Sequence, residues 1–244
     1  MSQLAFTAFS LNGVDAQKFL QGQVTVHTER LPENESRYTA ICDLKGRIHF
    51  GLWIKKLNPE SFELVTTQDQ AEEFAKHIKK FGAFSKMKLE EVGTVFPTTN
   101  GKQTEFSQTE TDINAWQIQA IQSGQAWITQ TTEHLFQPQE LRLHQRDGVH
   151  FDKGCYLGQE IVARLWFKAK PKHWLHLIQA KGDLPMPATQ LSKDVEVVNS
   201  ITFEDSYLAL AIAKPAALAE LNVNVLDLPD ALNGDVARIG RAHV

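Results

Sequence analysis

The stretch RYTAICDLKGRIHFGLWI, residues 37–54, decides the first half of the fold. Alternate residues from Tyr38 to Cys42 share one face, which is the period of a β-strand. Lys45 and Gly46 provide a turn, and a second alternating run follows it. The apolar residues that share one face of this second run are Ile48, Phe50, Leu52 and Ile54. The stretch therefore predicts an antiparallel hairpin with its turn near Lys45 and Gly46.

The sequence around this hairpin alternates helix and strand patterns. A short helical stripe (Ala16, Phe19, Leu20) precedes it, with Asp15 near the positive end of that helix. Residues 62–66 predict another strand, and apolar residues at helical spacing predict an amphipathic helix over residues 71–81. This order predicts an α+β region at the N-terminal side of the chain.

The C-terminal side shows mainly strand patterns. The expected elements are a strand over 174–179, a hairpin of 195–198 and 201–203 around Asn199 and Ser200, a strand over 207–212, a further strand over 236–239, and a short helix opened by Pro215. Short strands with turns between them predict a small β-barrel. Residues 98–114 and 182–190 read as loops. We expect a boundary near residues 167–172, which gives an N-terminal region 1–167 and a C-terminal region 168–244.

Composition limits the function classes. Of the 244 residues, 42% are hydrophobic and 22% charged, and the net charge of -4 argues against a surface devoted to nucleic acid. Two cysteines are too few for a disulfide framework. With no signal peptide and no membrane span recognisable, we expect a cytoplasmic protein whose thiols stay reduced.

Cys155 has the surroundings of a reactive thiol. It lies in KGCYLGQE, residues 153–160, and residues 159–164 read as a helix with Glu160 and Arg164 paired one turn apart. The helix end and the charge of Lys153 would both favour the thiolate, so replacing Lys153 by Ala should slow alkylation. The alternative is a small buried apolar residue, as many free cysteines are.

The segment KGCYLGQEIVAR, residues 153–164, resembles the signature of the YgfZ family, which is related to the glycine-cleavage T-protein and to mitochondrial iron–sulphur-cluster assembly factors. Residues 13–25, the hairpin turn 42–47, residues 84–86 and residues 136–139 resemble the same family. The resemblance covers most of residues 13–170.

The resemblance implies a T-protein-like α+β region followed by a β-barrel, binding of tetrahydrofolate, and a role in iron–sulphur-cluster assembly or repair that supports tRNA modification. Its partners would be iron–sulphur proteins, including tRNA-thiolating enzymes, with direct tRNA contact left open. It implies Cys155 and Lys153 as reactive-centre residues. The residues it implies for folate are Trp116, Phe6, Gln122, Gln159, Glu160 and Arg164. Core packing is the alternative for Trp116 and Phe6.

Three departures from the family bear on function. The region between Met87 and Trp116 is short, which would affect closure of a folate channel. Gln122 stands where the T-protein has a pterin-binding glutamate, and His49 and Phe50 stand where it has paired aspartates. An accessory protein is therefore favoured over an aminomethyl-type transferase, and a folate-sensing scaffold is the third alternative. A basic run from Arg164 to His173 would contact a polyglutamate tail or RNA phosphates, or be a solvated surface.

Overall fold

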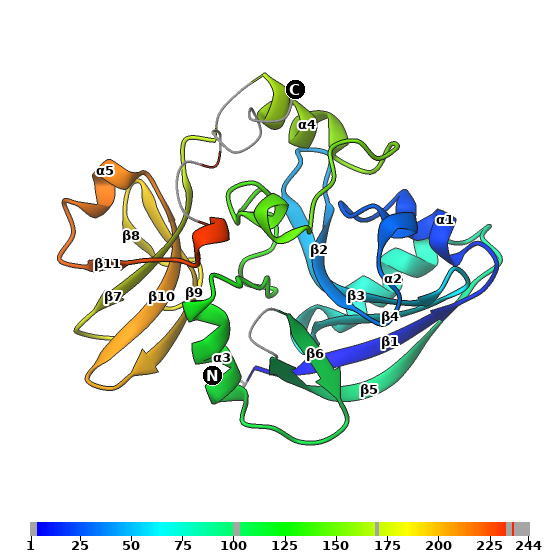
Figure 1. The fold of residues 1–244 in the computed structure, drawn as a ribbon, viewed down its shortest axis with the longest axis horizontal. Coiled ribbons are helices and arrows are strands. Elements are labelled where there is room, and N and C mark those ends of the chain that lie inside the picture. The colour runs from blue at the N-terminus through cyan, green and yellow to red at the C-terminus, as the bar shows by residue number, and fades with distance from the viewer. Residues whose placement is uncertain (1–3, 100–102, 169–170, 233–235, 237–244) are drawn as a thin grey trace.

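The computed structural model describes residues 4–99, 103–168, 171–232 and 236. Two antiparallel sheets lie on either side of a central group of helices and loops (Figure 1). The helices are α1 (Ala16–Gln21), α2 (Ala71–Phe81), α3 (Ile113–Gln122), α4 (Gln159–Phe167) and α5 (Pro215–Leu218), with 3-10 turns η1 (Thr28–Arg30), η2 (Gln68–Gln70), η3 (Leu143–Arg146) and η4 (Asp230–Leu232). The mixed helix and sheet architecture predicted from the sequence is confirmed.

The first sheet is six-stranded in the order β2-β3-β4-β1-β5-β6. Its strands are β1 (Phe6–Asn12), β2 (Ser36–Cys42), β3 (Ile48–Asn58), β4 (Ser61–Thr67), β5 (Lys88–Thr99) and β6 (Thr104–Ser107). The predicted hairpin is confirmed as β2 and β3, and its turn contains Gly46 with φ 70°. A left-handed backbone of this kind favours glycine.

A β-bulge changes the side-chain pattern of this hairpin. The register shifts so that Ile41 pairs with Phe50 but Cys42 pairs with Ile48. Ile48 therefore packs in one core cluster, whereas Phe50 and Leu52 pack in the other. The expectation that Ile48 shares a face with Phe50 was wrong, because the extra residue in a bulge reverses the alternation.

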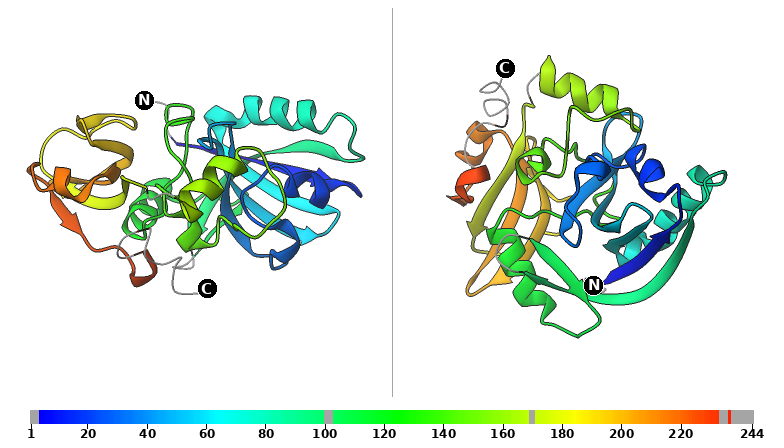
Figure 2. Two further views of the ribbon diagram at one scale, coloured as in Figure 1. Left: turned by 90° about the horizontal axis from the view of Figure 1, so that it is seen from above. Right: turned by 45° about the vertical axis from the view of Figure 1, so that its right-hand side comes forward.

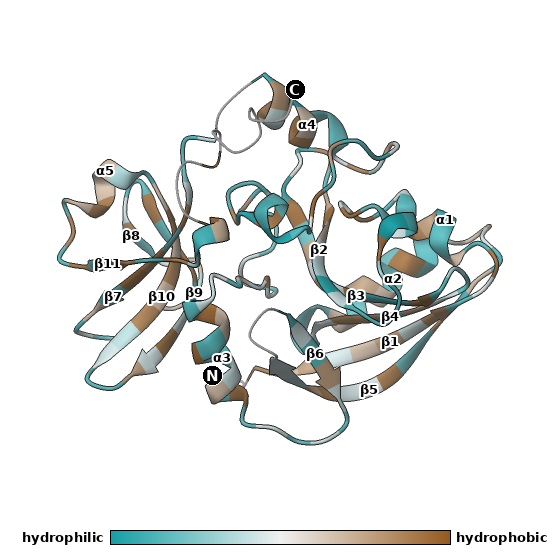
Figure 3. Ribbon diagram, viewed as in Figure 1, coloured by the Kyte–Doolittle hydropathy of each residue, from teal (hydrophilic) through white to brown (hydrophobic). Residues whose placement is uncertain are grey.

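Helices α1 and α2 cover one face of the first sheet (Figure 2). Phe19 and Leu20 of α1 and Phe74 and Ile78 of α2 join strand residues in a single buried cluster. The brown, apolar positions of these helices in Figure 3 lie among polar teal ones, as expected for amphipathic helices. Both helices were predicted correctly from their spacing.

The segment predicted as a loop over residues 98–114 is partly ordered into strand and helix. β5 continues to Thr99, β6 pairs with it through Phe96 and Ser107, and α3 begins at Ile113. The Asp112 side chain caps α3 by accepting from the backbone N–H groups of Asn114 and Ala115. A polar edge strand has little apolar alternation, so its pairing was not visible in the sequence pattern.

The second sheet is five-stranded in the order β11-β7-β10-β9-β8. Its strands are β7 (Trp174–Ala180), β8 (Gln190–Ser192), β9 (Val195–Phe203), β10 (Ser206–Ala213) and β11 (Asn224–Leu226). Within the described residues β8 and β11 do not pair with each other, so a closed barrel is not confirmed. The short helix opened by Pro215 is confirmed as α5, and most of the strand predicted at 236–239 lies outside the described residues.

The hairpin predicted around Asn199 and Ser200 was wrong, because these residues lie inside the continuous strand β9. The Asn199 side chain accepts from the backbone N–H of Trp127 at 3.0 Å and donates to the Trp127 carbonyl at 3.0 Å. An asparagine usually indicates a turn when it bonds to its own neighbours. Here its amide is satisfied by a segment distant in sequence.

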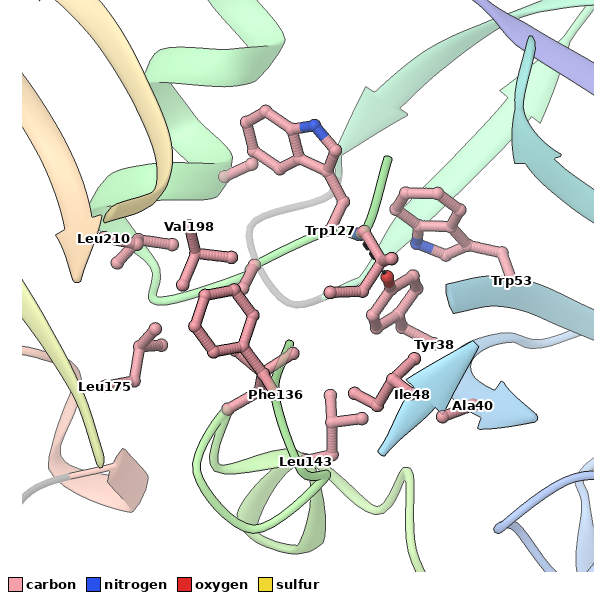
Figure 4. Close-up of a cluster of buried hydrophobic side chains, with 14 of the residues drawn as sticks. Tyr38, Ala40, Ile48, Trp53, Trp127, Phe136, Leu143, Leu175, Val198 and Leu210 are labelled. Carbon is pink, nitrogen blue, oxygen red and sulfur yellow. Dashed lines mark hydrogen bonds between the residues drawn. The ribbon is translucent and has the colours of Figure 1, made fainter. Parts of the chain in front are cut away.

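One buried cluster joins the two sheets (Figure 4). Phe136 lies between Leu175 and Val198 of the second sheet on one side and Ile48 of the hairpin on the other. The boundary expected near residues 167–172 does follow α4, which ends at Phe167. Because hydrophobic packing continues across it, the two regions share a core, and their description as separate domains stays a prediction.

Candidate functional site

The segment 153–158 forms a loop that leads into α4, with Cys155 exposed within it. The helix begins at Gln159 as predicted, so the thiol lies shortly before a helix N-terminus. Cys42 differs in every respect. It is fully buried in β2, and burial together with the charge of Asp43 raises the pKa of its thiol far above the ordinary value. Of the two cysteines, only Cys155 is exposed to a reactant.

Lys153 is buried and anchors this loop. Its Nζ donates to the carbonyl oxygen of Val24 and, at 2.9 Å, to that of Val26. The same nitrogen lies 4.8 Å from the centroid of the Tyr156 ring. Burial lowers the pKa of Lys153 to about 7. These contacts give Lys153 a positioning role, and its predicted effect on the Cys155 thiolate stays a prediction.

The cysteine loop packs directly on the β2–β3 turn. Gly158 adopts φ 80°, and a side chain there would collide with the Asp43 carbonyl and with the Cys42 side chain. Only glycine allows this approach together with a left-handed backbone. Gln159 closes the loop, because its Nε2 donates to the Lys153 carbonyl at 3.2 Å. Two sequence segments that resembled the same family, more than a hundred residues apart, are thus in contact.

Glu160 and Arg164 lie on the exposed surface of α4. Among the described residues the structure has no ion pair between them, so the predicted pair one turn apart is not confirmed. Neither residue lines a pocket described below. They flank the cysteine loop, and nothing in their contacts assigns them to a ligand.

A pocket of about 580 Å³ lies beside the start of β2, away from the cysteine loop. Its lining comes from both halves of the chain: Ser36, Arg37, Tyr38, Trp53, Gln103, Thr104, Ser123, Gln125, Gln145, Arg146, Asp147, Pro229, Ala231 and Leu232. Ligand pockets in proteins typically measure about 300–1,000 Å³. We call this space the central pocket.

Two hydrogen-bond donors in the central pocket lack a protein partner. Trp53 Nε1 and Gln145 Nε2 are both buried, and neither has an acceptor among the described residues. The Gln145 carbonyl is occupied, since it accepts from Arg142 at 3.0 Å. A buried donor without an acceptor costs about 1–3 kcal/mol, so such atoms favour a ligand rich in acceptors.

Two guanidinium groups, those of Arg37 and Arg146, line the central pocket. Arg146 is held by the Ser123 carbonyl at 2.8 Å and by the Gln125 amide oxygen at 3.0 Å. Burial, aided by the charge of Arg37, lowers the pKa of Arg146 to about 10, so it remains a cation at neutral pH. Arg37 is paired with two carboxylates, Glu35 at 3.6 Å and Asp147 at 3.5 Å. Within the described residues Arg146 has no ion-pair partner, so it is the cation of this pocket that an acidic group of a ligand would meet.

The aromatic residues predicted to contact folate form the wall behind this pocket. Phe6 is fully buried, with its ring centroid 5.5 Å from that of Trp53 and 5.2 Å from that of Trp116. Trp116 Nε1 donates to Thr104 Oγ1 at 3.1 Å. Core packing, the alternative from the sequence, describes both residues in this structure. Trp53 and Tyr38, which sequence reasoning did not select, are the aromatic rings that line the pocket.

Gln122 is exposed at the end of α3 and does not line the central pocket, whereas the nearby Gln125 is buried and does. The predicted contact of Gln122 with a pterin stays a prediction. No local pattern identified Gln125 or Gln145. Arg146 had a weak signal, since it belongs to a basic segment near the cysteine motif.

Within the described residues, no group of three or more His, Cys, Asp or Glu side chains is arranged to bind a metal ion. In the same part of the chain, none of the helices has the length and apolar character that crossing a membrane requires.

No protein-family model matches the chain. Sequence relatives are more informative. The tRNA-modifying protein YgfZ of Colwellia psychrerythraea is 29% identical over 234 residues, covering 74% of this chain and 71% of that protein. The tRNA-modifying protein YgfZ of Serratia proteamaculans is 26% identical over 242 residues, covering 77% and 72%. The chain is a relative of the YgfZ proteins. An uncharacterized protein of Haemophilus influenzae is also similar, at 28% identity over 205 residues.

A solved structure shares the fold of this chain. The glycine cleavage system aminomethyltransferase T from Bartonella henselae superposes with a TM-score of 0.67, covering 86% of this chain and 76% of that structure at 12% identity. Identity this low shows a shared fold alone. The chain thus combines a YgfZ-like sequence with an aminomethyltransferase-T-like fold, and it has two candidate centres, the cysteine loop and the central pocket.

Proposed function

We propose that this chain is a folate-binding accessory protein, acting in iron–sulphur-cluster assembly or repair and through it in tRNA modification. Tetrahydrofolate would occupy the central pocket, and Cys155 would be the reactive group presented to a partner. The YgfZ relatives are tRNA-modifying proteins, which supports the link to tRNA modification. The folate and iron–sulphur parts rest on the family resemblance and on the chemistry of the pocket.

The two unpaired donors in the central pocket are the observation that carries the folate proposal. Reduced folates offer a pterin carbonyl, an amide carbonyl and carboxylates as acceptors. Trp53 Nε1 and Gln145 Nε2 would donate to two of these groups. Arg146, which has no ion-pair partner within the described residues, would attract a carboxylate, and charge-assisted hydrogen bonds of this kind are about twice as strong as neutral ones.

The remaining residues implied by the family take supporting roles in this proposal. Phe6 and Trp116 would hold Trp53 in position rather than stack on the pterin. Gln159 would hold the cysteine loop, through its bond to the Lys153 carbonyl. Glu160 and Arg164 would face a partner protein from the exposed surface of α4.

Cys155 would act on a partner rather than hold a cluster alone. One thiolate is insufficient for an iron–sulphur cluster, which takes four protein ligands in common types. An exposed thiol on an anchored loop can instead contact an iron–sulphur protein directly. We place this activity in a reducing cytoplasm, where the thiol is available.

Calorimetric titration with tetrahydrofolate under anaerobic conditions tests the pocket. Trp53→Phe removes one donor while keeping an aromatic ring, so the dissociation constant should rise roughly two- to tenfold. Gln145→Leu should have a similar effect. Trp174→Phe, in β7 and outside the pocket lining, is the matched control and should bind like the parent protein. Equal affinities for all four proteins would remove folate from this pocket.

Two assays separate the accessory role from its alternatives. An aminomethyltransferase would release ammonia from an aminomethyl-lipoyl donor in the presence of tetrahydrofolate. We expect no turnover, since His49 and Phe50 replace the paired acids. A Cys155→Ser variant should bind folate normally yet fail to restore tRNA thiolation in cells lacking the homologue. Full restoration would instead support a folate-sensing scaffold.

A further inference from the structure

A second pocket, of about 530 Å³, lies at the β2–β3 turn and is distinct from the central pocket. It is lined by Asp43, Leu44, Lys45, Arg47 and His134. No residue of this set lines the central pocket or belongs to the cysteine loop. We call it the turn pocket, and its chemistry does not depend on the proposed folate site.

His134 is held in a defined orientation at the turn pocket. Its Nδ1 lies 2.9 Å from Asp43 Oδ2. Its backbone N–H donates to the Ile48 carbonyl at 2.7 Å, and its carbonyl accepts from Arg47 Nη1 at 3.0 Å. The residue has φ 60°, a left-handed conformation that costs a non-glycine residue about 1–3 kcal/mol. Several contacts thus hold one side chain in a conformation that the backbone alone disfavours.

The ring of His134 is also stacked. Its centroid is 4.3 Å from that of His49, and the His49 ring in turn lies 3.8 Å from that of Phe50. Burial, and then the charge of His134, lowers the pKa of His49, so His49 is neutral at neutral pH and does not repel a cation nearby. With Nδ1 directed to Asp43, the Nε2 of His134 has no protein partner among the described residues and remains available to a ligand.

The charges around the turn pocket favour an anion. Asp43 is its single acidic lining residue. Burial raises the pKa of the Asp43 carboxyl group. Hydrogen bonds from the backbone of Arg47, from His134 and from the backbone of Lys45 outweigh this effect, so the pKa of Asp43 lies below its ordinary value. The carboxylate is therefore already occupied. Within the described residues, the Lys45 ammonium group has no ion-pair partner.

Other acidic side chains lie further from the pocket. Glu133 and Glu73 act on His49 through their charge, and Glu140 and Glu196 are within electrostatic range of Arg47. Burial raises the pKa of both Glu140 and Glu196. None of these four residues lines the pocket, so the cations at its surface outnumber the anions.

We propose that the turn pocket binds the terminal phosphate of a phosphomonoester, with His134, Lys45 and Arg47 as its donors. A phosphate has three terminal oxygens, and three donor groups come from separate positions around the pocket. Arg47 keeps N–H groups beyond the one that donates to His134, and Lys45 contributes a flexible ammonium group. In the imidazolium form, which is the form proposed to bind phosphate, His134 Nε2 adds an N–H of fixed direction. Asp43 positions the imidazole through its contact with Nδ1.

Nuclear magnetic resonance of the histidine side chains tests the proposal, with AMP as the phosphate probe and adenosine as the control lacking phosphate. AMP should shift the imidazole signals of His134, whereas adenosine should not. His173 is an internal control, because it also pairs with a carboxylate, Asp194 at 3.2 Å, but lies outside the turn pocket. Equal shifts at His134 and His173, or equal shifts with sodium acetate at the same concentration, would overturn the assignment.

Substitution of the histidine gives an independent measurement. His134→Asn should keep the fold, because asparagine tolerates a left-handed backbone better than most residues. It should weaken AMP binding at least about tenfold, consistent with loss of a charge-assisted hydrogen bond of about 1.5–3 kcal/mol. His173→Asn is the matched control and should retain the parent affinity. Undiminished binding by His134→Asn would rule out the site.

Discussion

At the scale of single residues, burial distinguishes the two cysteines, and hydrogen bonds to the main chain make Lys153 the anchor of the cysteine loop. Cys155 is exposed, whereas Cys42 is enclosed under the same loop. Lys153 is connected to the main-chain carbonyls of Val24 and Val26, so its side chain fixes where the loop lies. The exposed thiol and the buried anchor of the loop thus lie two positions apart.

Iodoacetamide should modify Cys155 in the native protein and leave Cys42 unmodified until the protein is unfolded. The reason is both access and ionisation, since burial raises the pKa of the Cys42 thiol and alkylation requires the thiolate. Peptide mass spectrometry after timed alkylation measures both rates. A Cys155→Ser protein should show almost no native labelling. Comparable native rates at both positions would contradict the described burial.

Lys153→Met should lower the free energy of unfolding by about 1–3 kcal/mol, because it leaves buried carbonyl oxygens without a donor. Urea denaturation followed by circular dichroism measures the change. Lys168→Met is the matched control, since Lys168 is exposed just after α4 and its replacement should change stability by less than about 0.5 kcal/mol. If Lys153→Met leaves the free energy of unfolding unchanged, water must replace the ammonium group at the two carbonyl oxygens without loss of stability.

At the scale of elements, the cysteine loop and the β2–β3 turn form one unit. Gly158 touches Asp43 and Cys42, and a side chain on Gly46 would collide with Ile161 of α4. The turn also carries Asp43, which positions His134. A change in the packing of α4 on the β2–β3 turn would therefore alter the positions of both the cysteine loop and the residues of the turn pocket.

Gly158→Ala and Gly154→Ala should differ sharply although both lie in the same motif. Alanine at 158 meets the Asp43 carbonyl and must adopt a positive φ, so stability should fall by about 1–3 kcal/mol. Alanine at 154 meets no atom within 4 Å, and its effect should be within about 0.5 kcal/mol. Thermal unfolding of the two variants measures the contrast. Equal unfolding temperatures for the two variants would show that the packing of α4 does not depend on the close approach of Gly158 to the Asp43 carbonyl.

At the scale of the whole molecule, the buried histidines connect stability to pH. Burial is the main reason that the pKa values of His77, His144 and His176 are lowered to about 4. The ordinary value for histidine is about 6.5. Between pH 4 and pH 6.5 the unfolded chain binds more protons than the folded one. The contribution of these histidines to the free energy of unfolding is therefore fully present above pH 6.5 and is lost as the pH falls towards 4.

The free energy of unfolding should consequently fall as the pH decreases from 7 to 5, with each of these histidines contributing about 1–3 kcal/mol by pH 4. Urea titrations at several pH values measure the slope. His77→Gln removes one titrating group, and it should make the slope shallower. Lys79→Gln, on the exposed side of the same helix, is the control, because it removes no buried histidine. A stability independent of pH over this range would contradict the burial of these rings.

The sequence by itself determined the elements whose pattern is local. The β2–β3 hairpin, α1, α2 and α4 follow from spacing over a few residues, and so does the position of Cys155 before a helix. Such patterns report the alternation of side chains along one segment, which neighbouring residues impose directly.

Other features were decided by the tertiary structure alone. The bulge that turns Ile48 to the other face, the pairing of β6, and the use of Asn199 inside β9 all depend on partners distant in sequence. The central pocket is likewise assembled from segments between Ser36 and Leu232, and no periodicity within a segment encodes which residues will meet there. Packing and long-range hydrogen bonds select those contacts, because a buried polar group must find its partner wherever the folded chain provides one.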